Sequence, residues 1–103
     1  MPRIVSFEFS SDGPFGAEAA AAYAELADDI AGEDGLIWKF WTEDPGQSTA
    51  GGAYLFADEE SAERYIAEHT ARLGSFGITE ARVSNLAVNE QITATTFGPL
   101  TRG

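Results

Sequence analysis

The sequence predicts an α+β fold of the ferredoxin-like type, with the element order β-α-β-β-α-β. Two observations lead to it. Four segments carry the alternating or aromatic-rich pattern of strands, and two longer segments repeat apolar residues at helical spacing. Right-handed crossovers turn this order into a four-stranded antiparallel sheet with both helices on one face. A chain of 103 residues has room for one domain, so residues 1–103 form a single unit, folded from about residue 3 to residue 97.

The first half of the chain supplies three strands and one helix. Val5, Phe7 and Phe9 alternate with Ile4, Ser6 and Glu8, which is the period of a strand with one buried face. A turn-rich loop separates this strand from a helix in which apolar residues recur every three or four positions. The expected ranges are strand 3–10, helix 17–31 ended by Gly32, strand 35–43, turn 44–48 and strand 50–57.

The second half begins with a strong helix start. Asp58 stands at an N-cap position, and the acidic residues that follow it suit the positive end of the helix dipole. We expect a helix over residues 59–73 with Gly74 just past its end, and a long strand over residues 78–88. The threonine-rich tail, residues 89–97, favours a further short strand.

Composition excludes several classes of function. Seventeen acidic residues against six scattered basic ones give a formal net charge of -11, which disfavours nucleic acid and anionic membranes as partners. The sequence shows no membrane-spanning run and no signal peptide, and it contains no cysteine, which rules out disulfides and thiolate metal ligands. These features together indicate a cytoplasmic protein.

The central strands are apolar on both faces. Leu36, Trp38 and Phe40 are expected to point one way, and Ile37 and Trp41 the other. Because two helices cover one face of a sheet, the second face needs another cover. We expect a second copy of the chain, packed sheet against sheet in a homodimer. The alternative is that the strands curl and bury both faces within one chain.

Several stretches, taken together, resemble a known family. GLIWKFWTE is followed by AGGAYLFADEESAERYIAEHTARL, with DGPFG upstream and VNE downstream. From about Phe7 to Glu90 this colinear pattern resembles the YdhR-like mono-oxygenases of the dimeric α+β barrel superfamily. The resemblance implies a homodimeric barrel of two ferredoxin-like units and a mono-oxygenase-like oxidoreductase. Related barrels also perform haem breakdown, lactone isomerisation and dechlorination.

His69 is the single histidine and faces the sheet from the second helix. Its imidazole is the candidate general base, and a structural core histidine is the alternative. One histidine cannot build the common iron or zinc sites, so no metal is expected. No GxGxxG or P-loop pattern indicates a nucleotide cofactor. Haem, which needs one axial histidine, stays as the alternative to a reaction without any cofactor.

The remaining candidates are aromatic and charged residues of the expected helices and central strands. Arg72, Trp41 and Tyr54 are candidates to hold a substrate oxyanion as catalytic residues. Lys39 is the only lysine; as an alternative to a site role, it protects an edge strand against aggregation. Glu43 could pair with Lys39 or Arg72. The expected substrate-binding residues are Trp38, Tyr65, Tyr23, Lys39 and Glu43.

The function that follows is cofactor-independent mono-oxygenation of a small aromatic or polyketide-like substrate, in a pocket between sheet and helices. A base removes an acidic proton, and the anion that results reduces oxygen directly. Three alternatives stay open: a non-oxidative isomerase, lyase or cyclase of the same fold, a haem-binding protein, and a non-catalytic module that binds a hydrophobic ligand.

Overall fold

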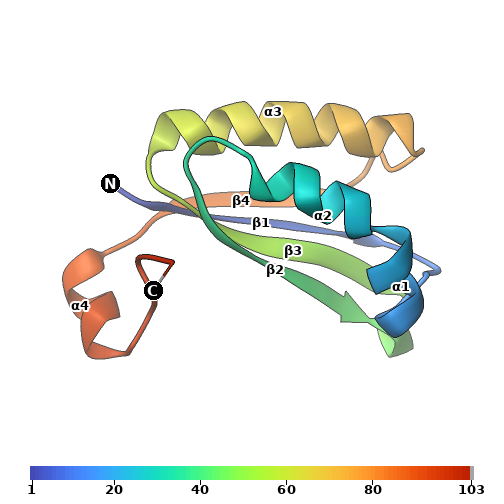
Figure 1. Ribbon diagram of the computed structural model, residues 1–103, viewed down its shortest axis with the longest axis horizontal. Coiled ribbons are helices and arrows are strands. Elements are labelled where there is room, and N and C mark those ends of the chain that lie inside the picture. The colour runs from blue at the N-terminus through green and yellow to red at the C-terminus, as the bar shows by residue number, and fades with distance from the viewer. Residues whose placement is uncertain (103) are drawn as a thin grey trace.

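The computed structural model describes residues 1–102 and confirms the ferredoxin-like α+β fold (Figure 1). The antiparallel sheet has the strand order β2-β3-β1-β4, with α2 and α3 on one face. The elements are β1 (Arg3–Ser10), α1 (Gly16–Ala22), α2 (Ala24–Ala31), β2 (Leu36–Asp44), the short 3₁₀ helix η1 (Pro45–Gln47), β3 (Thr49–Phe56), α3 (Glu59–Ser75), β4 (Arg82–Ala87) and α4 (Glu90–Thr95). None of the helices in residues 1–102 has the length and apolarity needed to cross a bilayer.

The core lies between the sheet and the helices α2 and α3. The alternation expected for β1 is confirmed, because Val5 and Phe7 are fully buried while Ile4 is partly exposed on the other face. Two neighbouring strands, β2 and β3, and the helices α2 and α3 complete the core with aromatic and aliphatic side chains: Ile30, Leu36, Tyr54, Phe56, Ala62, Tyr65 and Leu73. Residues from five elements therefore exclude water from the helix-facing side of the sheet.

The helix expected over residues 17–31 is two helices that meet at Tyr23. Tyr23 has a non-helical backbone (φ -107°, ψ 12°), while its amide still donates to the Ala19 carbonyl. The alanines of α1 bury no side chain, so packing does not force the two segments into one continuous helix. The break allows the Tyr23 ring to stack on Trp41, with centroids 6.1 Å apart and planes 11° from parallel.

The start of α3 matches the prediction and its end does not. The Asp58 carboxylate accepts a hydrogen bond from the Ser61 amide at 2.8 Å, which confirms the N-cap. The helix continues past Gly74 to Ser75, and Gly77 rather than Gly74 takes the left-handed conformation (φ 85°). The Ile78 amide donates to the Leu73 carbonyl and the Gly77 amide to the Gly74 carbonyl, which is a Schellman motif.

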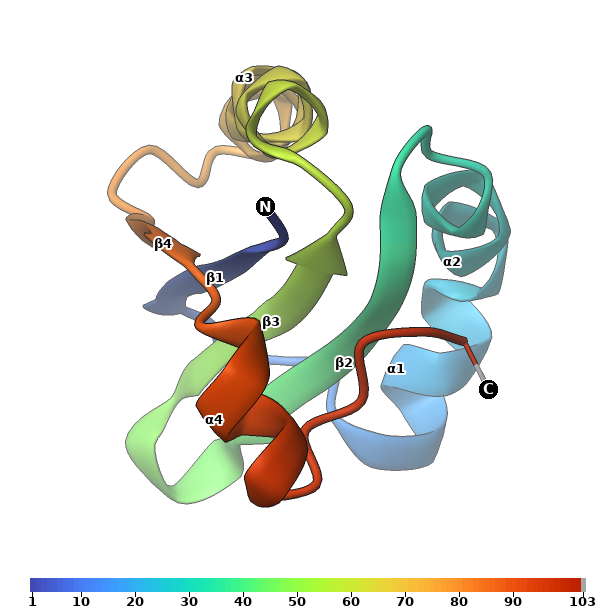
Figure 2. The same cartoon turned by 90° about the vertical axis from the view of Figure 1, so that its left-hand side faces the viewer.

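The last part of the chain corrects two further expectations. The strand predicted over residues 78–88 is only β4, and the tail predicted as a strand contains the helix α4. The Asn89 side chain accepts from the Ile92 amide and caps α4, which overrides the β preference of the threonines. The chain then returns across β2 (Figure 2), where the Trp38 indole donates to the Pro99 carbonyl.

A bulge in β2 changes which side chains share a face. Leu36 pairs with Phe56 and Trp38 pairs with Leu55, so Ile37 has no partner between them. Leu36 therefore lies on the helix-facing side, whereas the sequence placed it on one face with Trp38 and Phe40. Trp38 and Phe40 do lie together on the opposite side of the sheet.

The sheet face away from α2 and α3 is apolar in one half and polar in the other. Large exposed apolar side chains form what we call the far-face patch: Ile4, Phe40 and Leu86. The polar half holds the Ser6–Ser84 hydrogen bond and the Glu8–Arg82 ion pair. The chain's own C-terminal segment, bonded to Trp38, covers part of the apolar half.

Candidate functional site

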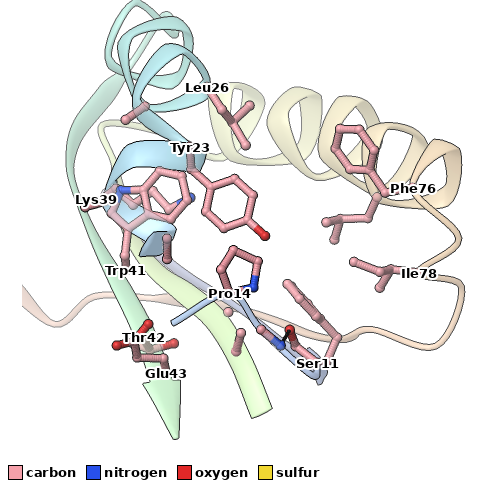
Figure 3. Close-up of a pocket in the computed structure, with 18 of the residues that line it drawn as sticks. Ser11, Pro14, Tyr23, Leu26, Lys39, Trp41, Thr42, Glu43, Phe76 and Ile78 are labelled. Carbon is pink, nitrogen blue, oxygen red and sulfur yellow. Dashed lines mark hydrogen bonds between the residues drawn. The ribbon is translucent and has the colours of Figure 1, made fainter. Parts of the chain in front are cut away.

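A cavity of about 840 Å³ opens between the sheet, the α1–α2 segment and the end of α3 (Figure 3). Its wall is mainly apolar, from Phe9, Leu26, Leu73, Phe76 and Ile78. Figure 3 shows the Tyr23 ring beside Trp41 with its hydroxyl directed away from Trp41, above Pro14, and shows Phe76 and Ile78 on the opposite side. The polar or aromatic side chains that line this cavity are Ser11, Tyr23, Lys39, Trp41, Thr42, Glu43, Tyr54 and His69.

The strand register brings Lys39 into this cavity. Lys39 pairs with Tyr54 and Trp41 pairs with Gly52, so both β2 side chains lie on the helix-facing side of the sheet. The Lys39 Nζ lies 3.4 Å from the centroid of the Trp41 ring and 4.7 Å from that of Tyr54. Gly52 makes this position available, because a Cβ there would stand only 2.9 Å from Lys39 Cε.

The electrostatic surroundings of Lys39 favour its neutral form. The ion pairs within residues 1–102 join Arg64 to Glu60, Arg72 to Asp29 and Arg82 to Glu8, so none involves Lys39. Burial, and then the positive charge of Arg72, lower the pKa of Lys39 to about 7. Contact with the aromatic faces of Trp41 and Tyr54 acts in the opposite direction, because it favours the cationic amine.

His69 is held as a neutral imidazole with a defined tautomer. Its ring stacks on Tyr65 at 5.0 Å and meets Phe7 edge-on at 4.9 Å, and the residue is 4% exposed. The Arg72 Nε donates to His69 Nδ1 at 3.2 Å, which leaves the ring proton on Nε2. Burial, followed by the charges of Lys39 and Arg72, lowers the pKa of His69 to about 3. The imidazole is therefore a hydrogen-bond donor rather than a base near neutral pH.

Arg72 lies behind His69, outside the cavity wall. Its Nη1 also donates to Asp29 Oδ2 at 3.1 Å, so Arg72 joins α3 to α2 while it orients the imidazole. Within residues 1–102, its buried Nη2 has no hydrogen-bond partner. Arg72 can thus act on a ligand only through His69 or through the field of its charge.

Two tyrosines form a buried hydroxyl pair beside this histidine. The Tyr65 hydroxyl donates to the Tyr54 hydroxyl at 3.2 Å, which leaves the Tyr54 proton free to donate elsewhere. Burial raises the pKa of Tyr65 to about 12 and raises that of Tyr54 well above its ordinary value. Both hydroxyls therefore stay neutral, and Tyr54 is the one that lines the cavity.

The structure brings together six of the nine residues that the sequence nominated: Tyr23, Lys39, Trp41, Glu43, Tyr54 and His69 all line the cavity. Tyr65 and Arg72 stand directly behind Tyr54 and His69. Trp38 lies on the other face of the sheet, against Phe40 and Pro99. Glu43 pairs with neither Lys39 nor Arg72. Its carboxylate accepts from the Gly16 amide at 2.9 and 3.1 Å.

Sequence reasoning missed Gly52 and the apolar end wall. The glycine pair in a strand is a signal of close approach, and at Gly52 it marks where the Lys39 stem crosses β3. Phe76 and Ile78 carried no such signal, because they were expected in a loop and in a strand. Within residues 1–102, no three histidine or carboxylate side chains gather as a metal site.

Comparisons with known proteins agree with this fold. A structure titled as a putative antibiotic biosynthesis monooxygenase from Deinococcus radiodurans is similar at a TM-score of 0.56 and 18% identity, covering 84% of this chain and 92% of that one. The structural-genomics protein YJCS is similar at a TM-score of 0.58 and 13% identity, and the alignment covers 86% of this chain and 100% of that one. At these identities the likeness defines the fold alone. No curated protein matches the chain.

The family is defined by sequence. Residues 4–99 match the family described as "Putative mono-oxygenase ydhR", and the chain belongs to that family. Apart from Arg3 at the start of β1, the match spans every strand and helix of the structure, including those that line the cavity.

Proposed function

We propose that this protein is a cofactor-independent mono-oxygenase for a small aromatic or polyketide-like substrate that carries an acidic C–H or O–H group. The observation that carries the proposal is the Lys39 amine, which lies in an apolar cavity between two aromatic rings and, among the described residues 1–102, forms no ion pair with a carboxylate. An amine whose pKa is about 7 is half neutral at neutral pH, which suits a general base.

Lys39 takes the role of base that the sequence suggested for His69. The His69 Nδ1 already accepts from Arg72 and its pKa is lowered to about 3, so the imidazole offers an N–H donor instead. The neutral Tyr54 hydroxyl is a second donor in the same wall. Donors fixed in an apolar cavity stabilise a developing anion more strongly than water does.

The chemistry balances without an external reductant. Lys39 removes a proton from an activated methylene or phenol, and the resulting anion transfers electrons to molecular oxygen. For a methylene group, CH₂ and O₂ give a carbonyl and one water, so the substrate supplies all four electrons that reduce the two oxygen atoms. The Lys39 ammonium formed in the first step stays beside the anion and lowers its energy. The apolar wall of Phe9, Leu26 and Phe76 keeps water from competing for these charges.

Oxygen uptake with anthrone as the substrate tests the proposal. We expect Lys39→Met to lower the enzymatic rate at least ~100-fold, which is the lower range for a general base. The wild-type rate should rise with pH through about 7, because the neutral amine is the active form. Arg82→Met, which removes an exposed charge on the other side of the sheet, is the matched control and should keep the full rate. An unchanged rate in Lys39→Met would contradict the proposed base.

A non-oxidative isomerase or lyase is the second candidate, because proton removal by Lys39 is a step that both reactions share. Product formation under nitrogen would identify it. Haem fits the site poorly, since the imidazole that would bind iron is packed between Phe7 and Tyr65 and hydrogen-bonded to Arg72. A Soret band on addition of haemin would contradict that conclusion.

A further inference from the structure

The Lys39 amine has the surroundings of a nucleophile as well as those of a base. We infer that Lys39 condenses with the carbonyl group of an aromatic aldehyde or unhindered ketone in the cavity, forming a reversible imine. The inference rests on the proposed function in that it uses the same cavity and amine, and it specifies aromatic carbonyl compounds as ligands. It does not depend on oxygen.

The geometry presents the amine to a flat ligand. The Lys39 stem crosses β3 at Gly52, and its Nζ lies over the face of Trp41. The Trp41 and Tyr23 rings lie nearly parallel and remain partly exposed at the cavity, 45% and 37%. An aromatic ring that enters beside them finds stacking surfaces next to the amine.

The groups that surround Lys39 keep a large share of its amine neutral near pH 7 and, within residues 1–102, give it no ion-pair partner. On β2 the Glu43 carboxylate is bound to the Gly16 amide, and on β3 Tyr54 presents a neutral hydroxyl. On α3 His69 is neutral and Arg72 is cationic, and the Arg72 charge is paired with Asp29 of α2. The helix junction contributes Tyr23. An apolar setting together with a nearby cation is the arrangement that activates lysine toward carbonyl compounds.

The step needs no oxidant or reductant. The neutral amine attacks the carbonyl carbon and a C–N bond forms. The nitrogen loses both of its protons, the carbonyl oxygen gains two, the C–O bond breaks, and the oxygen leaves as water. The Tyr54 hydroxyl and the His69 N–H are the donors available to the departing oxygen. The product is an imine between ligand carbon and Lys39 Nζ, and hydrolysis reverses it.

Reductive trapping gives a direct test, because the chain contains one lysine. The protein is incubated at pH 7 under nitrogen with benzaldehyde or 2-naphthaldehyde and sodium cyanoborohydride, which converts an imine into a stable secondary amine. Trypsin then reports the site, since an alkylated Lys39 resists cleavage. We expect Lys39 to react at least ~10-fold faster in the folded protein than in urea, where its pKa returns to about 10.4.

Internal controls keep the result independent of protein stability. The N-terminal α-amine, whichever residue carries it, is the reference amine for aldehyde reactivity in both states, and Lys39→Arg retains a cation but cannot form the adduct. Equal reactivity of Lys39 in the folded and unfolded chains would overturn the inference. Trapping at Lys39 with no oxygen uptake would support the imine while contradicting mono-oxygenation. Oxygen uptake that depends on Lys39, without trapping of an adduct, would support mono-oxygenation while contradicting the imine.

Discussion

Gly52 illustrates how a residue without a side chain determines the chemistry of its neighbours. A Cβ at this position would stand 2.9 Å from Lys39 Cε and 3.1 Å from the Tyr54 hydroxyl oxygen. Tyr54 is 1% exposed and cannot move away, whereas the lysine stem can. The position of the Lys39 amine therefore depends on the absence of a methyl group on the adjacent strand.

Gly52→Ala should displace Lys39 from Trp41 at a modest cost in stability. We expect a loss of about 1 kcal/mol in the free energy of unfolding, at the low end for overpacking, because a flexible stem absorbs the clash. The rate of aldehyde trapping at Lys39 should fall as well. Gly46→Ala, whose new Cβ would meet only an ordinary contact at 3.5 Å, is the control for both measurements. Unchanged trapping in Gly52→Ala would show that Gly52 does not position the amine.

The depressed pKa of Lys39 predicts how stability depends on pH. In the unfolded chain a lysine titrates near 10.4, whereas burial lowers the pKa of Lys39 to about 7 in the folded protein. Between about pH 7 and 10 the unfolded state therefore binds more protons, so the free energy of unfolding rises with pH over this window. Above it the trend reverses, because burial raises the pKa of both Tyr54 and Tyr65.

Lys39→Met should remove this rise, since methionine keeps much of the stem and cannot be protonated. Urea denaturation at intervals between about pH 6 and 10 measures the effect as the difference between wild type and variant. Parallel stability curves for the two proteins would contradict the lowered pKa.

The sequence predicted the positions of the site residues better than it predicted their chemical roles. The period of two put Lys39, Trp41 and Glu43 on one face of β2, because alternation holds beyond the bulge. The tautomer of His69 was not predictable, since it depends on whether the Arg72 side chain turns toward the imidazole or only toward Asp29. The pKa of Lys39 likewise depends on burial, which a sequence pattern does not measure.

At the level of elements, helix ends were harder to predict than helix starts. The start of α3 was predictable because an aspartate is a common N-cap residue. The Asp58 carboxylate accepts a hydrogen bond from the Ser61 amide, three positions further along the sequence. At the other end of α3, either Gly74 or Gly77 could have been the left-handed residue that ends the helix. Only the backbone angle φ shows that it is Gly77. The break at Tyr23 and the helix α4 depend on weak signals, namely an alanine run without packing and an Asn89 cap among threonines.

Gly74 inside α3 and Gly77 just beyond its end should respond to alanine with opposite changes in stability. Gly77→Ala forces a left-handed backbone on a residue with a Cβ, and we expect a loss of roughly 1–2 kcal/mol. Gly74→Ala adds a methyl group that meets nothing within 4 Å, and it should gain about 0.5–1 kcal/mol through helix propensity. Thermal unfolding of the pair provides its own control. A loss in Gly74→Ala would place the end of the helix at Gly74 after all.

For the whole molecule, the order of strands in the sheet was predictable from the element order and the handedness of the crossovers. What covers the sheet face away from α2 and α3 was not predictable from the strand patterns alone. The chain covers Trp38 with its own C-terminal segment, and Leu55 beside it is buried. What remains open is the far-face patch, in which Phe40 is 62% and Leu86 is 60% exposed. The homodimer stays a prediction, and this patch is where we expect the second copy.

Leu86→Lys should therefore weaken self-association without unfolding the chain. Introducing a charge into an apolar contact between two copies leaves that charge buried and unpaired in both. Val83→Lys is the matched control on the same strand, because Val83 pairs with Phe7 and lies on the helix-facing side. Sedimentation at micromolar concentration should give a dimer for wild type and control and 11.0 kDa monomers for Leu86→Lys. A monomeric wild type would contradict the prediction.

The helix α1 forms one wall of the cavity yet buries no side chain of its own. Its attachments to β2 are the Glu43–Gly16 hydrogen bonds at one end and the Tyr23–Trp41 stack at the other. Segments with so few buried contacts open at a small fraction of the global unfolding free energy and exchange their amide hydrogens first. We therefore expect these seven residues to open locally before the rest of the fold, which would widen the cavity while the sheet and α3 keep Lys39 and His69 in place.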